Sequence, residues 1–248
     1  ILDWWGSGGI DNVYIETMKT AGIEIEKYHP LRWYNFNRMN NRTHRKLLII
    51  DGKIGFIGGV GIADEWKGNA QDKDHWRDSH YWVEGPVVAE MQAAFNDNWI
   101  NTRSKVLLGK DYFPELKPIL GGVRAQIIKS MRYSSENVRL MNLLSISSAV
   151  KNIKLQAAYF VSDELTIQTL VAARNRGVDI EIIVPGPYMN KKLVQRASLS
   201  LWGILLDAGI KIYEYQPTMY HCKVLIVDDI WVSVGSTNFD DRSFRLND

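Results

Sequence analysis

The sequence has almost no cysteine and no long apolar run. Its single cysteine, Cys222, excludes an internal disulfide and a metal site built from cysteines alone. No stretch reaches the roughly 18 to 20 apolar residues that span a bilayer, and the first residues lack the basic and apolar pattern of a signal peptide. Because the chain opens at Ile1 without an initiator methionine, we expect a fragment, with room for a membrane anchor upstream.

An excess of charge of one sign is also nearly absent. The 30 basic and 28 acidic side chains leave a net charge of +2, too small to indicate a nucleic-acid binder by bulk electrostatics. Any site for a polyanion must therefore be local. Since 46% of the residues are apolar, the chain can bury a core of ordinary size, which excludes a disordered protein.

One stretch of the sequence occurs twice. Each copy has a histidine, a lysine two places later and an aspartate seven places after the histidine, and then continues into a second apolar stretch that ends at a small-residue pair. The first copy is Thr43–Asp51 with Gly55–Gly59, and the second is Tyr220–Asp228 with Val232–Ser236.

The segments around the two copies also correspond. Residues 21–30 and 208–217 both read as the end of a helix at glycine and then a strand closed by proline. The alternation of strands and helices predicts an α/β fold with two pseudo-symmetric halves, 1–118 and 119–248. By comparison with the second half, we expect that roughly 50 residues of the first half lie upstream of this sequence, and that the second half continues beyond its end. The predicted helices span 10–20, 162–176 and 190–207, and the predicted strands lie within 21–30, 153–159, 178–184 and 208–217.

The spacing within each copy points to phosphate chemistry. On a strand successive side chains alternate faces, so His44 and Lys46 project to one side and Arg45 to the other, and the same holds for His221 and Lys223. An imidazole beside an ammonium is unfavourable in a core but suited to holding a phosphate. The alternative is a satisfied core or surface histidine in each copy, but packing hardly explains polar residues duplicated on apolar strands.

The doubled motif resembles that of the phospholipase D superfamily, whose signature is H-x-K-x4-D followed by a glycine pair or Gly-Ser and x-Asn. The stretch Gly235–Ser243 matches the second-copy pattern completely. The resemblance implies two α/β/α halves with mixed sheets, packed together around one shared active-site cleft. Within the superfamily the chain is similar to bacterial cardiolipin synthases and related phosphatidyltransferases. That similarity lies in Asn41–Lys46, Gly58–Trp66, Trp76–His80, Val83–Val88 and Asn238–Asn247.

The resemblance implies a phosphohistidine mechanism without a metal or other cofactor. One histidine attacks phosphorus, and the other donates a proton to the leaving alcohol and then deprotonates the acceptor. The family pattern gives the attack to His44 and the acid–base work to His221, although the reverse assignment stays open. Asp51 and Asp228 are expected to orient structure rather than to touch substrate. The implied phosphate-binding side chains are Lys46, Lys223, Ser236 and Asn238.

Two further features of the family pattern fall on this chain. Asp78 stands where the family carries an acid that fixes the tautomer of a motif histidine, while the second-half equivalent falls near or beyond Asp248. The first copy has Gly61 where the pattern expects asparagine. This departure makes the site asymmetric, unless it is simple drift. Phosphate contacts there are then expected from the backbone near Gly59 or from Ser79.

Further residues are candidates for a site. His75 and His80, with Asp74 and Asp78, invite a metal site, but a histidine pair five residues apart is weak evidence and we expect no metal. The segment Arg32–Arg38 mixes cations with aromatic rings. It is either a solvated loop or a cleft rim that meets anionic lipid headgroups. Trp4, Trp5 and Tyr188 are candidates for the same rim.

The sequence thus favours transfer of a phosphatidyl group between phospholipids, with an anionic lipid such as phosphatidylglycerol as substrate. A phospholipase D that uses water as the acceptor, or a nuclease, is the second hypothesis. A lipid- or nucleic-acid-binding module without turnover is the third, and the retained histidines and lysines argue against it. The near-neutral charge favours lipid over nucleic acid, and we expect a location at the bacterial cytoplasmic membrane, either peripheral or anchored.

Overall fold

The computed structural model of the chain describes residues 1–28, 43–130, 136–240 and 243, and the chain forms two compact units. Unit 1 contains Ile1–Phe56 and Trp82–Ser135, and unit 2 contains Ile57–Tyr81 and Glu136–Arg245. The segment Arg32–Arg38, considered above as a rim, lies outside the described residues. Among the helices of the described part, none is both long and apolar enough to cross a bilayer.

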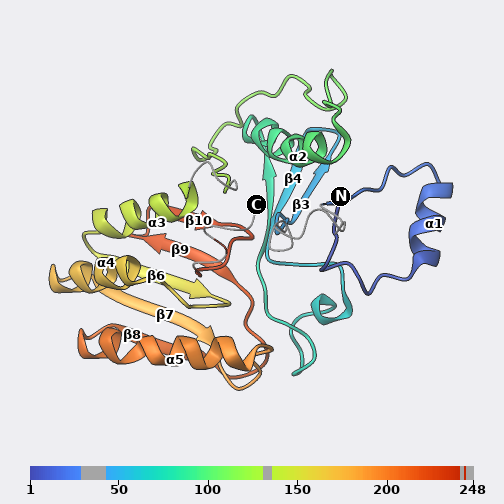
Figure 1. The fold of residues 1–248 in the computed structure, drawn as a ribbon. Helices are drawn as coiled ribbons and strands as arrows, with labels where there is room; N and C mark the ends of the chain where they lie inside the picture. The colour runs from blue at the N-terminus through green and yellow to red at the C-terminus, as the bar shows by residue number, and fades with distance from the viewer. Residues whose placement is uncertain (29–42, 131–135, 241–242, 244–248) are drawn as a thin grey trace. The chain divides into compact units, whose positions relative to one another are not determined.

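Unit 2 is built on a five-stranded mixed sheet with the order β10-β9-β6-β7-β8 (Figure 1). Strands β6 (Asn152–Ala157), β7 (Asp179–Pro185) and β8 (Lys211–Tyr215) run parallel. Strand β9 (Lys223–Val227) pairs antiparallel with β6, and β10 (Trp231–Val234) pairs antiparallel with β9. The predicted α/β fold with a mixed sheet is confirmed in this unit.

Three helices pack against one face of this sheet. They are α3 (Asn137–Ser148), α4 (Glu164–Asn175) and α5 (Lys192–Asp207), and they share one core with the buried strand residues. Helix α4 begins at Asp163, whose carboxylate accepts a hydrogen bond from a main-chain N–H of the first turn. The core residues include Ile146, Ile153, Leu155, Leu170, Ile180, Ile182, Leu205 and Leu225.

The topology places the second motif at one particular edge of the sheet. Strands β6 and β7 are parallel and therefore end at the same edge, and β9, which is antiparallel to β6, begins there. His221 precedes β9 by two residues, so its side chain lies beyond the carboxyl ends of β6 and β7. Open α/β sheets place their ligand sites at this edge.

Unit 1 contains a parallel pair of short strands and helices α1 and α2, and a three-stranded sheet passes through both units. Strands β4 and β5 of that sheet carry the chain from one unit to the other. Gly55 of β4 gives room to the Met91 thioether of α2, because a Cβ there would lie 2.5 Å from its sulfur. The elements are β1 (Leu2–Asp3), α1 (Asn12–Thr20), β2 (Lys27–Tyr28), β3 (Leu47–Ile50), β4 (Ile54–Gly58), η2 (Asp64–Trp66), β5 (His80–Glu84) and α2 (Val87–Arg103).

The aspartates of the two motifs occupy the same kind of turn. Asp51 and Gly52 join β3 to β4 with φ values of 52° and 64°, and Asp228 and Asp229 join β9 to β10 with φ values of 56° and 59°. Two successive positive φ values define the two-residue hairpin turn that matches the twist of its strands, and aspartate and glycine tolerate it. The geometry agrees with the structural role expected for both aspartates.

The carboxylate of Asp228 has a further structural contact. It accepts main-chain hydrogen bonds from Val150, Lys151 and Asn152 at the start of β6, at 2.7 to 3.2 Å. These bonds lower the pKa of Asp228, chiefly the one from Lys151. The motif aspartate therefore ties the hairpin to the central strand of the sheet.

The helix ends before the two motifs also correspond. Gly22 and Gly209 follow α1 and α5 with φ values of 84° and 82°. The next residues, Ile23 and Ile210, donate main-chain hydrogen bonds back into the last turn of each helix. A left-handed residue of this kind favours glycine because it has no Cβ, so the predicted helix stops are confirmed.

Two strand predictions were wrong in extent. The histidines do not lie on strands, because β3 begins at Leu47 and β9 at Lys223. At His221 the main-chain N–H is already bonded, at 2.7 Å, to the carbonyl of Arg77 from another segment. The strand expected within 21–30 is reduced to β2, because its partner β1 offers only two residues for pairing.

Candidate active site

The first motif is anchored to helix α2 by alternate residues. The guanidinium of Arg45 donates to the carbonyl of Ala94 at 2.6 Å, to Oδ1 of Asn98 at 3.0 Å and to the carbonyl of Ser130 at 3.0 Å. The side-chain amide of Asn98 donates to the hydroxyl of Thr43 at 2.9 Å. A planar guanidinium with several partners holds this segment far more rigidly than a lysine would.

Because side chains alternate along the segment, His44 and Lys46 point away from the side on which Thr43 and Arg45 bind their partners. The ammonium of Lys46 lies 3.2 Å from Nε2 of His44. Because an ammonium can only donate, a hydrogen bond between them requires an unprotonated Nε2 on His44. The predicted same-side pairing of histidine and lysine is therefore present in the first motif, although neither residue lies in a strand.

The second motif contains a buried triad of side chains within unit 2. Nδ1 of His221 lies 2.6 Å from Oδ2 of Asp78, and the ammonium of Lys223 lies 3.1 Å from Nδ1 and 3.4 Å from Nε2. Lys223 also donates to the carbonyl of His221 at 2.6 Å. The His221 side chain is 6% exposed and that of Asp78 is 1% exposed. A carboxylate on Nδ1 fixes the tautomer and reserves Nε2 for chemistry.

Asp78 is held in its charged form by several donors. The indole N–H of Trp66 donates to its Oδ2 at 3.0 Å, and the main-chain N–H of Ser79 donates to its Oδ1 at 2.8 Å. Burial alone would raise the pKa of this carboxyl, but the hydrogen bond with His221 and the charge of Lys223 outweigh it and hold the pKa below its ordinary value. Asp78 is therefore an anion at neutral pH.

The glycines of the first motif make room for this arrangement. A Cβ at Gly59 would collide with the carboxylate of Asp78, so only glycine fits. A Cβ at Gly61 would lie 3.0 Å from the indole of Trp66, which is tighter than ordinary contact. The asparagine that the family pattern expects at Gly61 would press on the ring that supports Asp78, which gives the departure from the pattern a physical consequence.

Aromatic rings enclose the His221 imidazole. The ring centres of Trp76, Trp66 and Tyr159 lie 5.3, 5.6 and 5.9 Å from the imidazole centre, and Trp66 and Tyr159 meet it edge to face. Such walls lower the local dielectric and strengthen the interaction of His221 with Asp78. Trp66 and Trp76 belong to segments singled out in the sequence, but nothing there indicated contact with His221, and Tyr159 gave no signal.

The loop after β7 contributes to the rim of this site. The hydroxyl of Tyr159 and Oδ1 of Asn190 lie 2.9 Å apart, and the tyrosine donates. The ammonium of Lys191 lies 4.9 Å from the centre of the Tyr159 ring, within the range of a cation–π contact. A cation is therefore held on the same ring that forms a wall for His221.

Asn238 and Ser236 lie after β10 in unit 2. Asn238 is buried, and its carboxamide oxygen has no hydrogen-bond partner among the described residues. A buried amide oxygen without a donor is costly, by about 1 to 3 kcal/mol, and is expected to find a partner when a ligand binds. The predicted contact of Asn238 and Ser236 with phosphate stays a prediction, as does that of Ser79, whose hydroxyl lies 3.4 Å from the sulfur of Cys222.

The remaining candidates have separate surroundings. Nδ1 of His75 lies 2.6 Å from Oδ1 of Asp72, a pair near the surface. For His80, burial lowers the pKa. Within the described ranges, no three histidine, cysteine or acidic side chains gather as ligands for a metal ion. Trp4 and Trp5 lie together in unit 1, with ring centres 6.0 Å apart.

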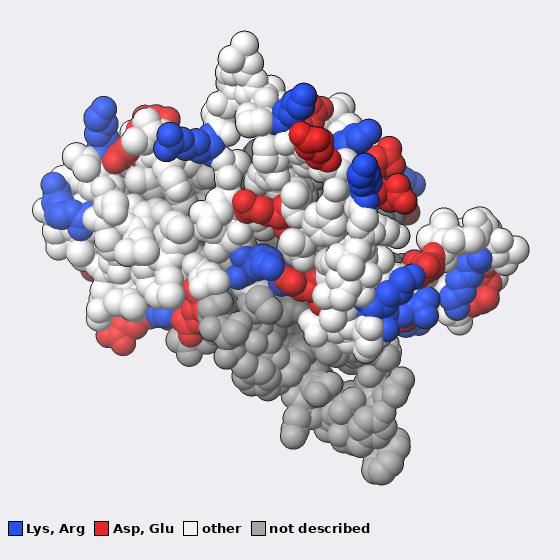
Figure 2. Space-filling view, turned by 90° about the horizontal axis from the view of Figure 1, so that it is seen from above, with Lys and Arg blue, Asp and Glu red and all other residues white. Residues whose placement is uncertain are grey.

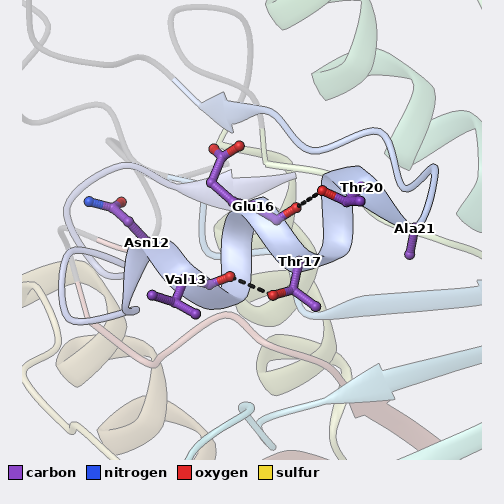
Figure 3. Close-up of a pocket in the computed structure, with 6 residues that line it drawn as sticks. All are labelled: Asn12, Val13, Glu16, Thr17, Thr20 and Ala21. Atoms are coloured by element: carbon purple, nitrogen blue, oxygen red, sulfur yellow. Dashed lines mark hydrogen bonds between the residues drawn. The ribbon is translucent and has the colours of Figure 1, made fainter.

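A hollow beside α1 is lined by that helix alone, with one acid and no base among the lining residues (Figure 3). Its threonines donate to the helix's own carbonyl groups. Basic and acidic side chains alternate over the face shown in Figure 2, as the balanced composition predicts. The lining residues are Asn12, Val13, Glu16, Thr17, Thr20 and Ala21.

Known proteins are similar to this chain in sequence. Residues 143–248 match the family described as cardiolipin synthase, PLD-like domain. The whole chain is 37% identical over 250 residues to a cardiolipin synthase of Geobacillus sp. (strain WCH70), of which it covers 50%. The matches are thus to proteins of the phospholipase D type, which the chain resembles over its whole length. A cardiolipin synthase of Geobacillus kaustophilus (strain HTA426) is also 37% identical, over 254 residues that include all of this chain and 50% of the relative.

A likeness of fold extends over nearly the whole chain. The solved phosphatidylserine synthase of Haemophilus influenzae Rd KW20 aligns with 95% of this chain and 62% of its own, with a TM-score of 0.63 and 12% identity. At that identity the likeness establishes the fold alone. The chain spans about half the length of the curated relatives that it matches.

Proposed function

We propose that this phospholipase D-like chain carries out phosphodiester exchange on phospholipids, by phosphatidyl transfer through a phosphohistidine. The observation that supports this best is the buried contact of His221 with Asp78 at 2.6 Å, with the Lys223 ammonium beside the same ring. A carboxylate, an imidazole and a cation together can take up a proton and hold an anionic oxygen. An ordinary core has no use for three ionisable groups at one point.

The proposed first step forms a bond from His44 to phosphorus and breaks the bond from phosphorus to the leaving alcohol. The Lys46 contact suits an unprotonated Nε2 on His44, and a nucleophilic imidazole requires such a nitrogen. His221 supplies the proton that the leaving oxygen takes. In the second step the acceptor hydroxyl returns a proton to His221 and attacks phosphorus, which frees His44. The proposal requires both motifs, one in each predicted half, 1–118 and 119–248, to reach one phosphorus.

Cationic side chains are proposed to offset the charge of the phosphoryl oxygens. Lys46 and Lys223 each stand beside a motif histidine, so a phosphoryl group that reaches the imidazole also reaches an ammonium. The buried carboxamide of Asn238 and the hydroxyl of Ser236 would complete the contacts. With two ammonium groups present, the proposed chemistry does not depend on a metal ion.

We propose a second phospholipid as the acceptor, and phosphatidylglycerol as the substrate. The relatives that match the whole chain are named cardiolipin synthases, which supports transfer over hydrolysis. The aromatic walls around His221 point the same way, because they limit the access of water to an intermediate.

The test supplies phosphatidylglycerol vesicles to the purified protein, expressed with any sequence that flanks this chain in its gene. The proposal predicts cardiolipin and glycerol as products. It predicts loss of both in His44→Ala and in His221→Ala, whereas the control His75→Ala, whose ring pairs with Asp72 near the surface, keeps activity. Phosphatidic acid as the sole product would replace transfer with hydrolysis. An unchanged rate in either motif variant would remove that histidine from the chemistry.

A further inference from the structure

Residues 186–196 comprise the loop after β7 and the start of α5. They form a surface, the shoulder, beside the His221 site. The side-chain amide of Gln195 donates to the carbonyl of Gly186 at 3.0 Å, and the ammonium of Lys192 donates to that of Pro187 at 2.8 Å. Met189 is buried against Tyr159. Side chains of α5 and the ring of Tyr159 therefore contact this loop from two sides.

This shoulder exposes both apolar and basic side chains. Leu193 is 81% exposed and Tyr188 is 42% exposed, although both are large and apolar in body. Lys191, Lys192 and Arg196 stand between and beside them, and all three are exposed. Leucine, tyrosine and cations mixed at the start of a helix are typical of a surface that enters the headgroup region of a bilayer.

The charge of the shoulder differs from that of the chain as a whole. Residues 186–200 contain three basic side chains and no acidic one, whereas the full chain has 30 bases and 28 acids. The excess of basic over acidic side chains in this segment therefore differs from the balanced charge of the whole chain. It favours an anionic partner, and each lysine or arginine near an anionic lipid surface contributes roughly a fivefold gain in affinity.

The shoulder is continuous with the site. The ammonium of Lys191 lies over the face of the Tyr159 ring, whose edge faces the imidazole of His221. One ring thus separates the basic surface from the histidine proposed for acid–base work. A lipid whose headgroup contacts the shoulder would therefore have its phosphate close to the His221 site.

We propose that residues 186–196 dock on an anionic lipid surface and so bring headgroups to the His221 site. This inference rests on the proposed function, because it names the surface by which the same site meets its lipid. An apolar line along α5 extends the docking face, since Leu193 and Ile204 are exposed and Ala197 lies between them on the same side. The local excess of basic side chains fits an anionic lipid better than a second copy of this near-neutral chain.

The direct test places an environment-sensitive NBD fluorophore at Leu193→Cys and, as the matched control, at Leu140→Cys on α3, which is 51% exposed. The natural Cys222 is buried and should stay unlabelled. With vesicles that contain phosphatidylglycerol, emission from position 193 should shift to the blue and that from position 140 should not. The same response from both positions, or none from 193, would overturn the proposal.

A functional test uses Leu193→Glu and Arg196→Glu, with Leu140→Glu as control. Activity on phosphatidylglycerol vesicles should fall about tenfold in the first two and stay unchanged in the control. Activity on a short-chain phosphatidylglycerol below its critical micelle concentration should be equal in all. A loss of activity on monomeric lipid in the two variants would contradict the docking role. So would a changed oligomeric mass of these variants together with unchanged activity on vesicles. Absence of wild-type activity on both substrates would instead count against the proposed function.

Discussion

Asp78, which follows the glycine pair of the first motif, hydrogen-bonds the histidine of the second motif, His221, at 2.6 Å and across 143 positions of sequence. Two other contacts bring the same segments together, because Arg77 and Tyr220 form an isolated bridge and the His221 N–H donates to Arg77. The first copy therefore supplies the acid that orients the histidine of the second. The two copies of the motif are not independent modules.

Replacement of Asp78 tests this orientation. In Asp78→Asn an amide takes the place of the anion and cannot stabilise the imidazolium that forms when His221 accepts a proton. We expect kcat to fall on the order of 10³-fold with little change in KM. The matched control, Asp74→Asn, removes an exposed carboxylate that pairs only with Lys73 among the salt bridges described, and it should keep full activity. Equal activity of the two variants would show that Asp78 has no role in the chemistry.

The pH dependence of stability provides a second test. The pKa of Asp78 is lowered in the folded protein, so its contribution is complete above the unfolded value of about 3.9 and is lost as the pH falls through the lower folded value. The difference in free energy of unfolding between wild type and Asp78→Asn should shrink as the pH falls below about 4. Urea unfolding at a series of acidic pH values measures this difference. A difference that grows as the pH falls below about 4 would contradict a lowered pKa of Asp78.

Gly59 should not tolerate a side chain. In Gly59→Ala the new methyl group collides with the carboxylate of Asp78, which must move away from His221. We expect activity to fall about 100-fold or more, because small displacements of an orienting group are costly. Gly203→Ala on α5 is the control, since a Cβ there meets no described atom within 4 Å. If the two alanine variants were equally active, the close approach of Gly59 to Asp78 would be irrelevant to function.

The thiol of Cys222 should be inert in the folded protein. Burial raises its pKa, and the side chain is 1% exposed beside Ser79. At pH 8 a thiol reagent such as DTNB should therefore react with it at least about 100-fold more slowly in native than in urea-unfolded protein. Comparable rates in the two states would mean that the strand next to the site opens readily.

The sequence singled out the candidate site residues because they repeat. The two histidine and lysine pairs, the turn aspartates and the helix-ending glycines all rest on local rules of spacing, turns and caps. Local rules could not say which histidine receives Asp78, because that contact joins segments far apart in the chain. The same limit applies to Tyr159, which ends up beside His221 only because β6 and β9 are neighbours in the sheet.

Strand ends were the least predictable feature. The apolar runs predicted that strands contain the motif histidines. A strand ends, however, where its partner strand ends or where another segment forms hydrogen bonds with its main chain. At His221, the carbonyl of Arg77 accepts the main-chain hydrogen bond. The sequence also did not predict the exposed basic shoulder at the start of α5. The apolar spacing of 190–207 predicts a helix but does not indicate which of its sides faces solvent.

The central claim, a phosphohistidine on His44 that His221 resolves, is tested most directly by trapping the intermediate. A radiolabelled phosphatidyl ester of p-nitrophenol has a leaving group that departs without a proton, so His221→Ala should still form the intermediate but fail to release it. After alkaline quench and digestion, we predict acid-labile label on the peptide that contains His44, accumulating in His221→Ala and absent from His44→Ala. Label on His221 in the wild type, or no acid-labile label in any variant, would contradict the account.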